Sequence, residues 1–284
     1  MNIGMVLEGS FPPDIRVEKA ARTLIRGGYT VHLLCRLKDD QVPDEDIRGV
    51  HVHRRIFLYP NNFLAQKWNN LNDLLAFRNP KLIREIKAFV QNYGIDVLHV
   101  HDLPPLRSAL DAVRRLKTPV IADLHENYPA AIQFYDTPQT LKGRFASNTN
   151  RWKKYEYQAV RRADHVIVVV DEAKTRLIED CHLPPEQITV ISNTEDIDYF
   201  TGLALNSEII DRYQGQFVLA YVGGFGPHRG IDVPIQALPQ LIDKIPNINS
   251  YWLVMARFVA IWKILLRRRM LATMLSLQGG SRLS

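Results

Sequence analysis

The sequence has few cysteines and no long apolar run. Cys35 and Cys181 are the only cysteines among 284 residues, too few for a disulfide framework or a four-cysteine zinc site. No unbroken apolar stretch reaches the length that spans a bilayer. The chain enters an apolar strand pattern at once, without a basic leader or a small-residue cleavage site, so we expect no signal peptide. These absences predict a cytoplasmic protein.

Acidic residues are missing from the last part of the chain. The formal net charge is +6, and residues 249–284 contain cations but no acidic residue. We expect no nucleic-acid partner, because the rest of the chain carries no net charge and no arginine run among aromatics. The cations of this segment are Arg257, Lys263, Arg267, Arg268, Arg269 and Arg282.

A dinucleotide-binding turn is also missing. The first predicted strand is followed by Glu8-Gly-Ser-Phe-Pro-Pro13, whereas NAD-binding Rossmann domains have Gly-x-Gly-x-x-Gly at this place. The composition, with 46% hydrophobic and 23% charged residues, is nevertheless typical of a soluble globular protein. We therefore expect no NAD chemistry from this chain, although its composition is that of an ordinary soluble protein.

Short apolar runs alternate with amphipathic stretches through the first 193 residues. Apolar residues at helical spacing over 17–25 stop at Gly27-Gly28, and a second helix begins at Pro80 and stops at Gly94. Strands that alternate with helices imply right-handed crossovers and a parallel sheet covered on both faces. We therefore predict an α/β fold with a Rossmann-like, doubly wound parallel sheet. Its strands are predicted at residues 3–7, 30–35, 50–56, 97–100, 120–124, 165–170 and 188–191.

Polar residues follow three of these strands. They are Glu8-Gly-Ser-Phe-Pro-Pro-Asp-Ile-Arg16, His99-Val-His-Asp102 and His125-Glu-Asn-Tyr-Pro129. In an open parallel sheet the carboxyl ends of the strands border the ligand crevice, so polar residues gathered there indicate a binding site.

A second, incomplete Rossmann-like domain is predicted after residue 193. Residues 194–216 are polar without a clear period, and residues 217–248 give a strand, a glycine-rich turn and a helix. In the turn, Val222-Gly-Gly-Phe-Gly-Pro-His-Arg-Gly230, backbone N–H groups could approach a phosphate with Arg229 as counter-charge. The alternative is that these glycines only make the bend.

Several segments together resemble the retaining glycosyltransferases of family 4, which have the GT-B architecture of two facing Rossmann-like domains. The resemblance covers residues 1–248, with residues 1–193 as the N-terminal, acceptor domain. The segments that carry it are Phe11-Pro-Pro-Asp-Ile-Arg-Val-Glu-Lys19, Asp123-Leu-His-Glu-Asn-Tyr-Pro129, Ala163-Asp-His-Val-Ile-Val-Val-Val170, Val190-Ile-Ser-Asn193 and Tyr221-Val-Gly-Gly-Phe225.

The resemblance implies transfer of a sugar from a nucleoside diphosphate sugar to an acceptor hydroxyl with retention, and no cofactor. Carbohydrate or glycolipid acceptors are the family's commonest setting. His125 would position the reacting sugar, and Gly223, Gly224 and Arg229 would bind the donor phosphates, with Gly224 standing where many relatives have a second basic residue. Acceptor or sugar contacts would come from Pro12, Pro13, Asp14, Arg16, His101, Asp102, Glu126 and Tyr128.

Some of these residues have simpler interpretations. His125 could pin a loop, and Glu126 and Tyr128 could cap the next helix and pack under Pro129. His99, His101 and Asp102 could bind a metal. We expect no metal, because the family works without one and alternating strand residues point to opposite faces.

Residues 249–284 fit no part of the resemblance, since they show neither a helix nor a strand period typical of a Rossmann domain. Reading each triplet one nucleotide earlier forces glycine from Met255-Ala256 and glutamate from Trp262-Lys263. That frame can encode the family's next segment, so we interpret this tail as frameshifted and expect weak or absent transferase activity. The alternatives are a basic amphipathic helix over 252–277 on an anionic membrane and a non-catalytic protein that binds an acceptor or a partner.

Overall fold

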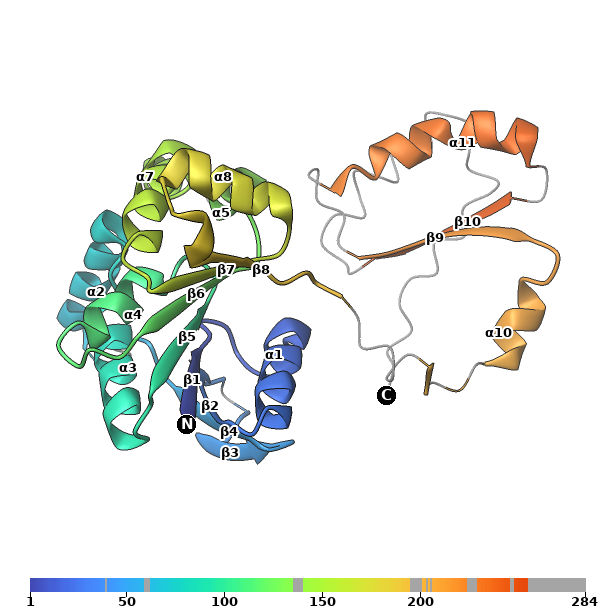
Figure 1. Ribbon diagram of the computed structural model, residues 1–284. Helices are drawn as coiled ribbons and strands as arrows, with labels where there is room; N and C mark the ends of the chain where they lie inside the picture. The colour runs from blue at the N-terminus through green and yellow to red at the C-terminus, as the bar shows by residue number, and fades with distance from the viewer. Residues whose placement is uncertain are drawn as a thin grey trace. The chain divides into compact units, whose positions relative to one another are not determined.

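The computed structural model describes residues 1–38, 40–58, 62–134, 140–194, 201–202, 204, 206–223, 229–245 and 248–254. The chain forms two compact units, Met1–Thr194 and Glu195–Ser284. The first unit contains a large sheet with helices on both faces, and the second contains a two-stranded sheet (Figure 1).

The large sheet has the strand order β3-β4-β2-β1-β5-β6-β7-β8. Neighbouring strands are parallel except at one edge, where β3 runs antiparallel to β4. The α/β fold with a doubly wound parallel sheet is therefore confirmed. The strands are β1 (Asn2–Val6), β2 (Thr30–Arg36), β3 (Asp44–Ile47), β4 (Val50–Arg55), β5 (Val97–His101), β6 (Val120–Leu124), β7 (His165–Val168) and β8 (Ile188–Val190).

Helices cover the two faces of this sheet with separate apolar cores. Val17 and Ala21 of α1 pack with alternate residues of β1, β2 and β4, and the larger core on the other face includes residues of α3, α4, α7 and α8 (Figure 1). The helices of this unit are α1 (Ile15–Arg26), α2 (Phe63–Ala76), α3 (Pro80–Asn92), α4 (Leu106–Val113), α5 (Tyr128–Ala131), α6 (Leu141–Ala146), α7 (Thr149–Val160) and α8 (Asp171–Cys181), with 3-10 turns η1 (Ile132–Phe134) and η2 (Pro185–Gln187).

Local chemistry explains where the two predicted helices begin. Asp14 caps α1, because its Oδ1 accepts hydrogen bonds from the backbone N–H of Arg16 and Val17. Asn79 caps α3 in the same way, and Pro80 stands at the first helical position, where no backbone N–H is needed. Close seating of α3 depends on Gly4 of β1, where a Cβ would lie 2.9 Å from Phe89 Cε1 of that helix.

Several elements have no stated counterpart in the sequence prediction, and β3 and α2 are two of them. β3 has the sequence Asp-Glu-Asp-Ile, whose charges hide its strand character, and it is an edge strand whose first three residues are exposed. Arg54 of β4 explains why it folds there: this arginine is 2% exposed and its Nη2 pairs with Glu45 of β3 at 2.8 Å. Arg54 also donates to the carbonyl oxygens of Phe11 and Val42.

The second unit contains the predicted strand and helix, together with a short helix inside the predicted link over 194–216 and one further strand. β9 (Phe217–Gly223) precedes α11 (Asp232–Lys244), with α10 (Ser207–Arg212) before them. β10 (Ile248–Val254) then pairs in parallel with β9 along its full length. Our expectation that residues from 249 onward lack a strand was therefore wrong for 249–254, and residues 255–284 lie outside the described part. None of the described helices is long and apolar enough to cross a membrane.

Candidate functional site

The strand order fixes where a ligand crevice is expected. β1 lies between β2 and β5, so the chain leaves β1 toward one half of the sheet and later builds the other half beyond β5. Loops at such a reversal of strand order diverge, and ligands of open α/β sheets bind at that point beside the carboxyl ends of the strands. The loop after β1 and the loop after β5 are the two that carry Glu8–Arg16 and Asp102.

Three histidines and one aspartate gather on β5 and at the end of β6. The register pairs His101 of β5 with Asp123 of β6, and side chains two residues apart share a face. His99, His101, Asp123 and His125 are each less than 9% exposed. We call these four residues the crevice cluster.

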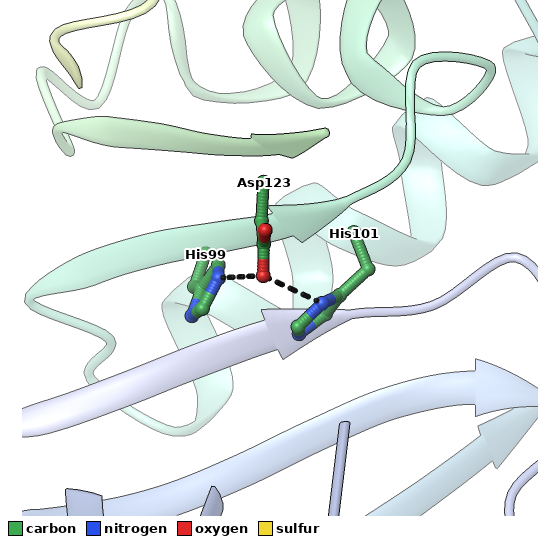
Figure 2. A group of neighbouring side chains, drawn as sticks. All are labelled: His99, His101 and Asp123. Carbon is green, nitrogen blue, oxygen red and sulfur yellow. Dashed lines mark hydrogen bonds and ion pairs between the residues drawn. The ribbon is translucent and has the colours of Figure 1, made fainter. Parts of the chain in front are cut away.

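Asp123 is the centre of the crevice cluster. Its Oδ2 lies 3.0 Å from His99 Nε2, 3.3 Å from His101 Nδ1 and 3.2 Å from His125 Nε2. Figure 2 shows the carboxylate between the rings of His99 and His101. Burial alone would raise the pKa of Asp123, but hydrogen bonds from His101, His125 and His99 hold it far below its usual range. The carboxylate therefore stays charged and orients all three rings.

The histidines of the crevice cluster differ in protonation. Complete burial lowers the pKa of His101 to about 4, and the neighbouring His99 adds to this effect, so His101 is neutral near pH 7. Burial opposes the charged form of His125 too, but the hydrogen bond and charge of Asp123, followed by the charge of Asp102, raise its pKa above 6.5. His125 is thus the ring of this pair that favours the imidazolium form.

Asp102 lies close to Nδ1, the second ring nitrogen of His125. His125 Nδ1 lies 3.3 Å from Asp102 Oδ1, but the two are not aligned as a hydrogen bond, and this buried nitrogen has no hydrogen-bond partner among the described residues. Asp102 has φ of 67°, in the left-handed region, and its backbone N–H donates to the carbonyl oxygen of Asp123 at 2.8 Å. Burial raises the pKa of Asp102, whereas His125 and Arg16 oppose that change.

Hydrogen bonds with Tyr155 of α7 hold the loop after Asp102 in place. The buried Tyr155 hydroxyl donates to the carbonyl oxygen of Leu103 at 2.9 Å and accepts from the backbone N–H of Arg107 at 3.0 Å. An aromatic side chain with a polar end suits such a position, because the ring fills the core while the hydroxyl satisfies backbone groups. Tyr155 thereby ties α7 to the loop that presents Asp102.

The geometry of His99 and His101 corrects one step of the sequence reasoning. These residues are two positions apart, so they share a face, and their rings stack with centroids 4.4 Å apart. With Asp123 they offer three ligand atoms within 4.8 Å of one another, an arrangement that could hold a metal ion. Hydrogen bonding to Asp123 already accounts for the arrangement, and the absence of a metal stays a prediction.

The loop after β1 presents the predicted acceptor residues in different ways. Pro12, Pro13 and Arg16 are exposed, whereas the Asp14 carboxylate is engaged in capping α1. Phe11 is 1% exposed and anchors the loop in the core. Arg16 belongs with the crevice cluster, because its charge acts on both Asp102 and His125.

Glu126 and Tyr128 do not cap the following helix. The cap of α5 is Asn127, whose Oδ1 accepts from the backbone N–H of Ala130 at 3.3 Å. Glu126 is exposed, and the half-buried Tyr128 packs on Trp152 with ring centroids 4.5 Å apart. The capping part of the simpler interpretation was therefore wrong for both residues, and Tyr128 packs on Trp152, whereas packing under Pro129 stays a prediction.

The predicted donor residues are only partly described. Gly223 is the last residue of β9, the exposed Arg229 lies three residues before α11, and Gly224 lies outside the described residues. The first turn of α11 has no side-chain cap. The backbone N–H of Val233 nevertheless donates to the carbonyl oxygen of Gly230 at 3.1 Å, and Pro234 has no N–H, so this helix start offers few free donors to an anion.

Asp123 and Glu8 are site residues that the sequence prediction did not assign. Asp123 stands two positions before His125, and strand alternation would have placed the two on one face. Glu8 lies two residues beyond the end of β1; burial raises the pKa of its carboxyl, and the charge of Asp73 on α2 adds to this change. No local sequence signal relates Glu8 to Asp73, because the two charges belong to elements far apart in the chain.

A second histidine group, which we call the edge cluster, lies on β2 and β4 with two carboxylates of β3. It comprises His32, His51, His53, Asp44 and Asp46. His32 Nδ1 lies 3.1 Å from His53 Nε2, and His53 Nδ1 lies 2.8 Å from Asp44 Oδ1. Asp46 pairs with His51. Tyr93 stacks on His53 with ring centroids 3.9 Å apart and closes this cluster against α3.

Solved structures with the same arrangement of elements are glycosyltransferases. Sucrose-phosphate synthase from Thermosynechococcus elongatus matches with a TM-score of 0.72 at 14% identity, covering 97% of this chain and 69% of that one. HepE from Anabaena, in complex with UDP and glucose, matches with a TM-score of 0.64 at 15% identity over 96% of this chain and 68% of that one. A glycosyltransferase from Rickettsia africae has a TM-score of 0.65 at 16% identity, with 97% and 67% covered. These likenesses show the GT-B fold.

The sequence itself matches a family model. No curated protein is significantly similar to the chain in sequence. The model of Glycosyltransferase Family 4, however, matches residues 15–199. This match includes the crevice cluster and most of the first unit, and it covers more than half of the chain. The protein therefore belongs to glycosyltransferase family 4.

Proposed function

We propose that this protein takes part in transferring a hexosyl group from a nucleoside diphosphate sugar to an acceptor hydroxyl, with retention at the anomeric carbon. Family membership supports the reaction class. A uridine nucleotide as donor is supported by the complexes of HepE with UDP and glucose and with UDP-glucose. The acceptor is a carbohydrate or glycolipid hydroxyl received by the first unit.

The state of His125 is the observation that carries this proposal. Asp123 occupies Nε2 and raises the pKa of the ring, while Nδ1 has no aligned partner among the described residues. A protonated Nδ1 at this place can donate to a sugar hydroxyl and favours negative charge nearby. His125 would thus position the sugar, and Asp102 would receive or share that hydrogen bond.

Stabilisation of the leaving diphosphate would supply most of the catalysis. The negative charge that develops on a departing nucleoside diphosphate is best met by fixed donors and cations. In the second unit the exposed Arg229 offers a cation, and backbone N–H groups of the glycine-rich turn before α11 would supply the donors. Gly223 lets the backbone at the end of β9 lie close to the phosphates, and we expect neither a metal nor another cofactor to be required.

Residues 255–284 are the reason that we propose weak activity for the chain as written. They carry cations but no acidic residue, whereas the neighbouring reading frame can supply the acidic segment that the resemblance calls for. Because β10 already forms over Ile248–Val254, the frame as written is compatible with the fold up to Val254. We therefore place the proposed frame change near Met255.

Turnover of UDP-hexoses by the chain and by a frame-restored version tests this function. We expect the restored version to transfer sugar with retention, visible in the anomeric signals of the product, and to keep its activity in EDTA. His125→Ala in the restored version should lower kcat by about 100-fold, the order found on removing one transition-state donor. His165→Ala is the matched control, since His165 lies on the same sheet at the amino end of β7 and contacts Thr189.

Two outcomes would contradict the proposal. Equal turnover by both versions would refute the frame change, and equal losses in His125→Ala and His165→Ala would refute the role of His125. A chain that binds acceptor sugars but turns over no nucleotide sugar in either version would instead be the non-catalytic binding protein.

A further inference from the structure

Helix α2 carries its apolar side chains on the outside. Leu64, Trp68, Leu71 and Leu75 are spaced by four, three and four residues, which places them along one stripe of a helix. Their exposed fractions are 75%, 62%, 44% and 58%, and Phe63 at the start of the helix is 79% exposed. In an ordinary amphipathic helix such a stripe faces the core, so its exposure calls for a partner.

Polar contacts hold the opposite side of α2 against the domain. Asn69 is 1% exposed, and its Oδ1 accepts from the backbone N–H of Lys81 at 3.0 Å, which ties α2 to the start of α3. The guanidinium of Arg151 donates to the carbonyl oxygen of Leu74. Because these contacts use polar groups on the inner side, the helix is seated without its apolar stripe.

The exposed apolar area continues from α2 to α6. Leu141 and Phe145 of α6 are 85% and 45% exposed. Arg151 joins the two helices, because its guanidinium lies 3.9 Å from the centroid of Phe77 and 4.6 Å from that of Phe145. We call this region the α2–α6 surface. It comprises Phe63, Leu64, Trp68, Leu71, Leu75, Leu141 and Phe145, with Arg151 between its parts.

Cations accompany this apolar surface. Lys67 lies beside Trp68 on α2, and Lys142 and Arg144 flank Gly143 on α6; all three are exposed. Asp73 is the acidic residue that α2 contributes, and α6 has none. The described part of the α2–α6 surface thus combines exposed aromatic and aliphatic side chains with an excess of positive charge.

We propose that the α2–α6 surface docks on an anionic lipid bilayer. Apolar side chains rimmed by lysine and arginine match the acyl boundary and the anionic headgroups respectively. A second copy of the same surface fits less well, because cations would face cations. The tail of this chain fits poorly for the same reason, since residues 249–284 carry cations and no acidic residue.

Docking in this way would also bring the crevice to the lipid. Phe77 at the end of α2 packs on Trp152 with ring centroids 4.5 Å apart, and the predicted acceptor residue Tyr128 packs on the same ring at 4.5 Å. The charge of Asp73 on α2 also acts on Glu8 in the loop after β1. The helix with the exposed stripe therefore borders the loop that we expect to receive the acceptor. This step rests on the proposed function and predicts an acceptor hydroxyl on a lipid-linked sugar, whereas docking itself does not depend on it.

Sedimentation with vesicles tests the docking. We expect the full chain to bind vesicles of 30% phosphatidylglycerol in phosphatidylcholine and to bind pure phosphatidylcholine at least tenfold more weakly. The variant Trp68→Ser/Leu71→Ser should lower binding to the anionic vesicles about tenfold or more, because two exposed apolar anchors are lost. Lys142→Gln/Arg144→Gln should lower it several-fold and flatten its dependence on salt. The matched control is Val233→Ser, which removes a 66% exposed apolar side chain from α11 and should leave binding unchanged.

Circular dichroism and concentration-dependent sedimentation complete the test. Both surface variants should keep the wild-type helix content, since the substituted side chains are exposed. Equal binding by wild type and Trp68→Ser/Leu71→Ser would overturn the proposal, as would a self-association that this variant abolishes without any binding to vesicles. Loss of vesicle binding in a variant that still turns over a soluble acceptor would support docking separately from the transfer reaction.

Discussion

The crevice cluster and the edge cluster use the same residue types to opposite effect. Both place two histidines at alternate positions of one strand beside a histidine from a neighbouring parallel strand, and both add carboxylates, from β6 in the crevice cluster and from β3 in the edge cluster. In the crevice cluster the carboxylate of Asp123 is central and its side chain is only 12% exposed. In the edge cluster the Asp44 side chain is 52% exposed and reaches His53 from the border of the sheet.

This difference decides which histidine carries a proton. Asp123 overcomes the burial of His125 and raises its pKa, whereas burial prevails at His53 and lowers its pKa despite Asp44. At His32, burial and the neighbouring His51 and His53 lower the pKa to about 4. The buried Asp123, with Asp102 nearby, thus outweighs burial at the partly buried His125, but it does not do so at the completely buried His101, and the solvated Asp44 does not do so at His53. The three predictions below use this contrast.

The largest effect is expected from neutralising the central carboxylate. Asp123→Asn should lower the pKa of His125 below 6.5 and destabilise the first unit by about 3 kcal/mol, because three buried rings lose their common charged acceptor. Histidine NMR titration and urea unfolding at pH 7 measure the two effects.

The edge cluster supplies the control for that experiment. Asp44→Asn removes a half-exposed carboxylate, so it should cost less than about 1 kcal/mol at pH 7. A loss at Asp44 equal to that at Asp123 would show that the central position of Asp123 has no special effect.

A smaller effect is expected from Asp102. Asp102→Asn should lower the pKa of His125 less than Asp123→Asn does, since Asp102 acts through its charge while Asp123 also accepts a hydrogen bond. The raised pKa of His125 contributes stability that is complete below 6.5 and disappears as the pH rises through the folded-state value. The variant should therefore lose this contribution at a lower pH than the wild type. If His125 has the same pKa in Asp102→Asn as in the wild type, Asp102 does not act on His125.

The smallest effect is expected at the edge cluster in acid. His32 has a folded-state pKa of about 4 against 6.5 when unfolded, so the unfolded chain binds the proton first. Stability should fall as the pH drops from 6.5 toward 4. At pH 5, the urea midpoint of His32→Gln should be raised relative to that of the wild type, compared with the difference between the two midpoints at pH 8. His165→Gln should show no such change. An equal difference between the urea midpoints of His32→Gln and wild type at pH 5 and at pH 8 would contradict this prediction.

Much of the fold could be predicted from the sequence because its strands are buried on both faces. Near-continuous apolar runs marked β1, β5 and β6 to within one residue at either end. β3 could not be found in this way, since its stability depends on pairing with β4 and on the buried Arg54. α2 was missed because its apolar stripe faces outward, and nothing in the sequence states which side of a helix is covered.

The position of the site could be predicted from the sequence, but the hydrogen bonds and ion pairs within it could be predicted less well. The polar residues after β1, β5 and β6 indicated the crevice edge, and His125 was placed by the family resemblance. The shared use of Asp123 by three histidines depends on the register between β5 and β6, which the sequence does not determine. Asp14 and Asn127 turned out to cap helices, a role that competes for the same polar side chains that could bind a sugar.

The reversal of strand order at β1 and β5 has a further consequence for how this protein can change over time. The loops that leave these strands contribute few side chains to the two cores, which are built mainly from the strands and from the inner sides of α1, α3, α4, α7 and α8. An exposed residue such as Arg16 can therefore be exchanged at small energetic cost to the fold. A lineage of such proteins can explore new acceptors by drift while its scaffold stays intact.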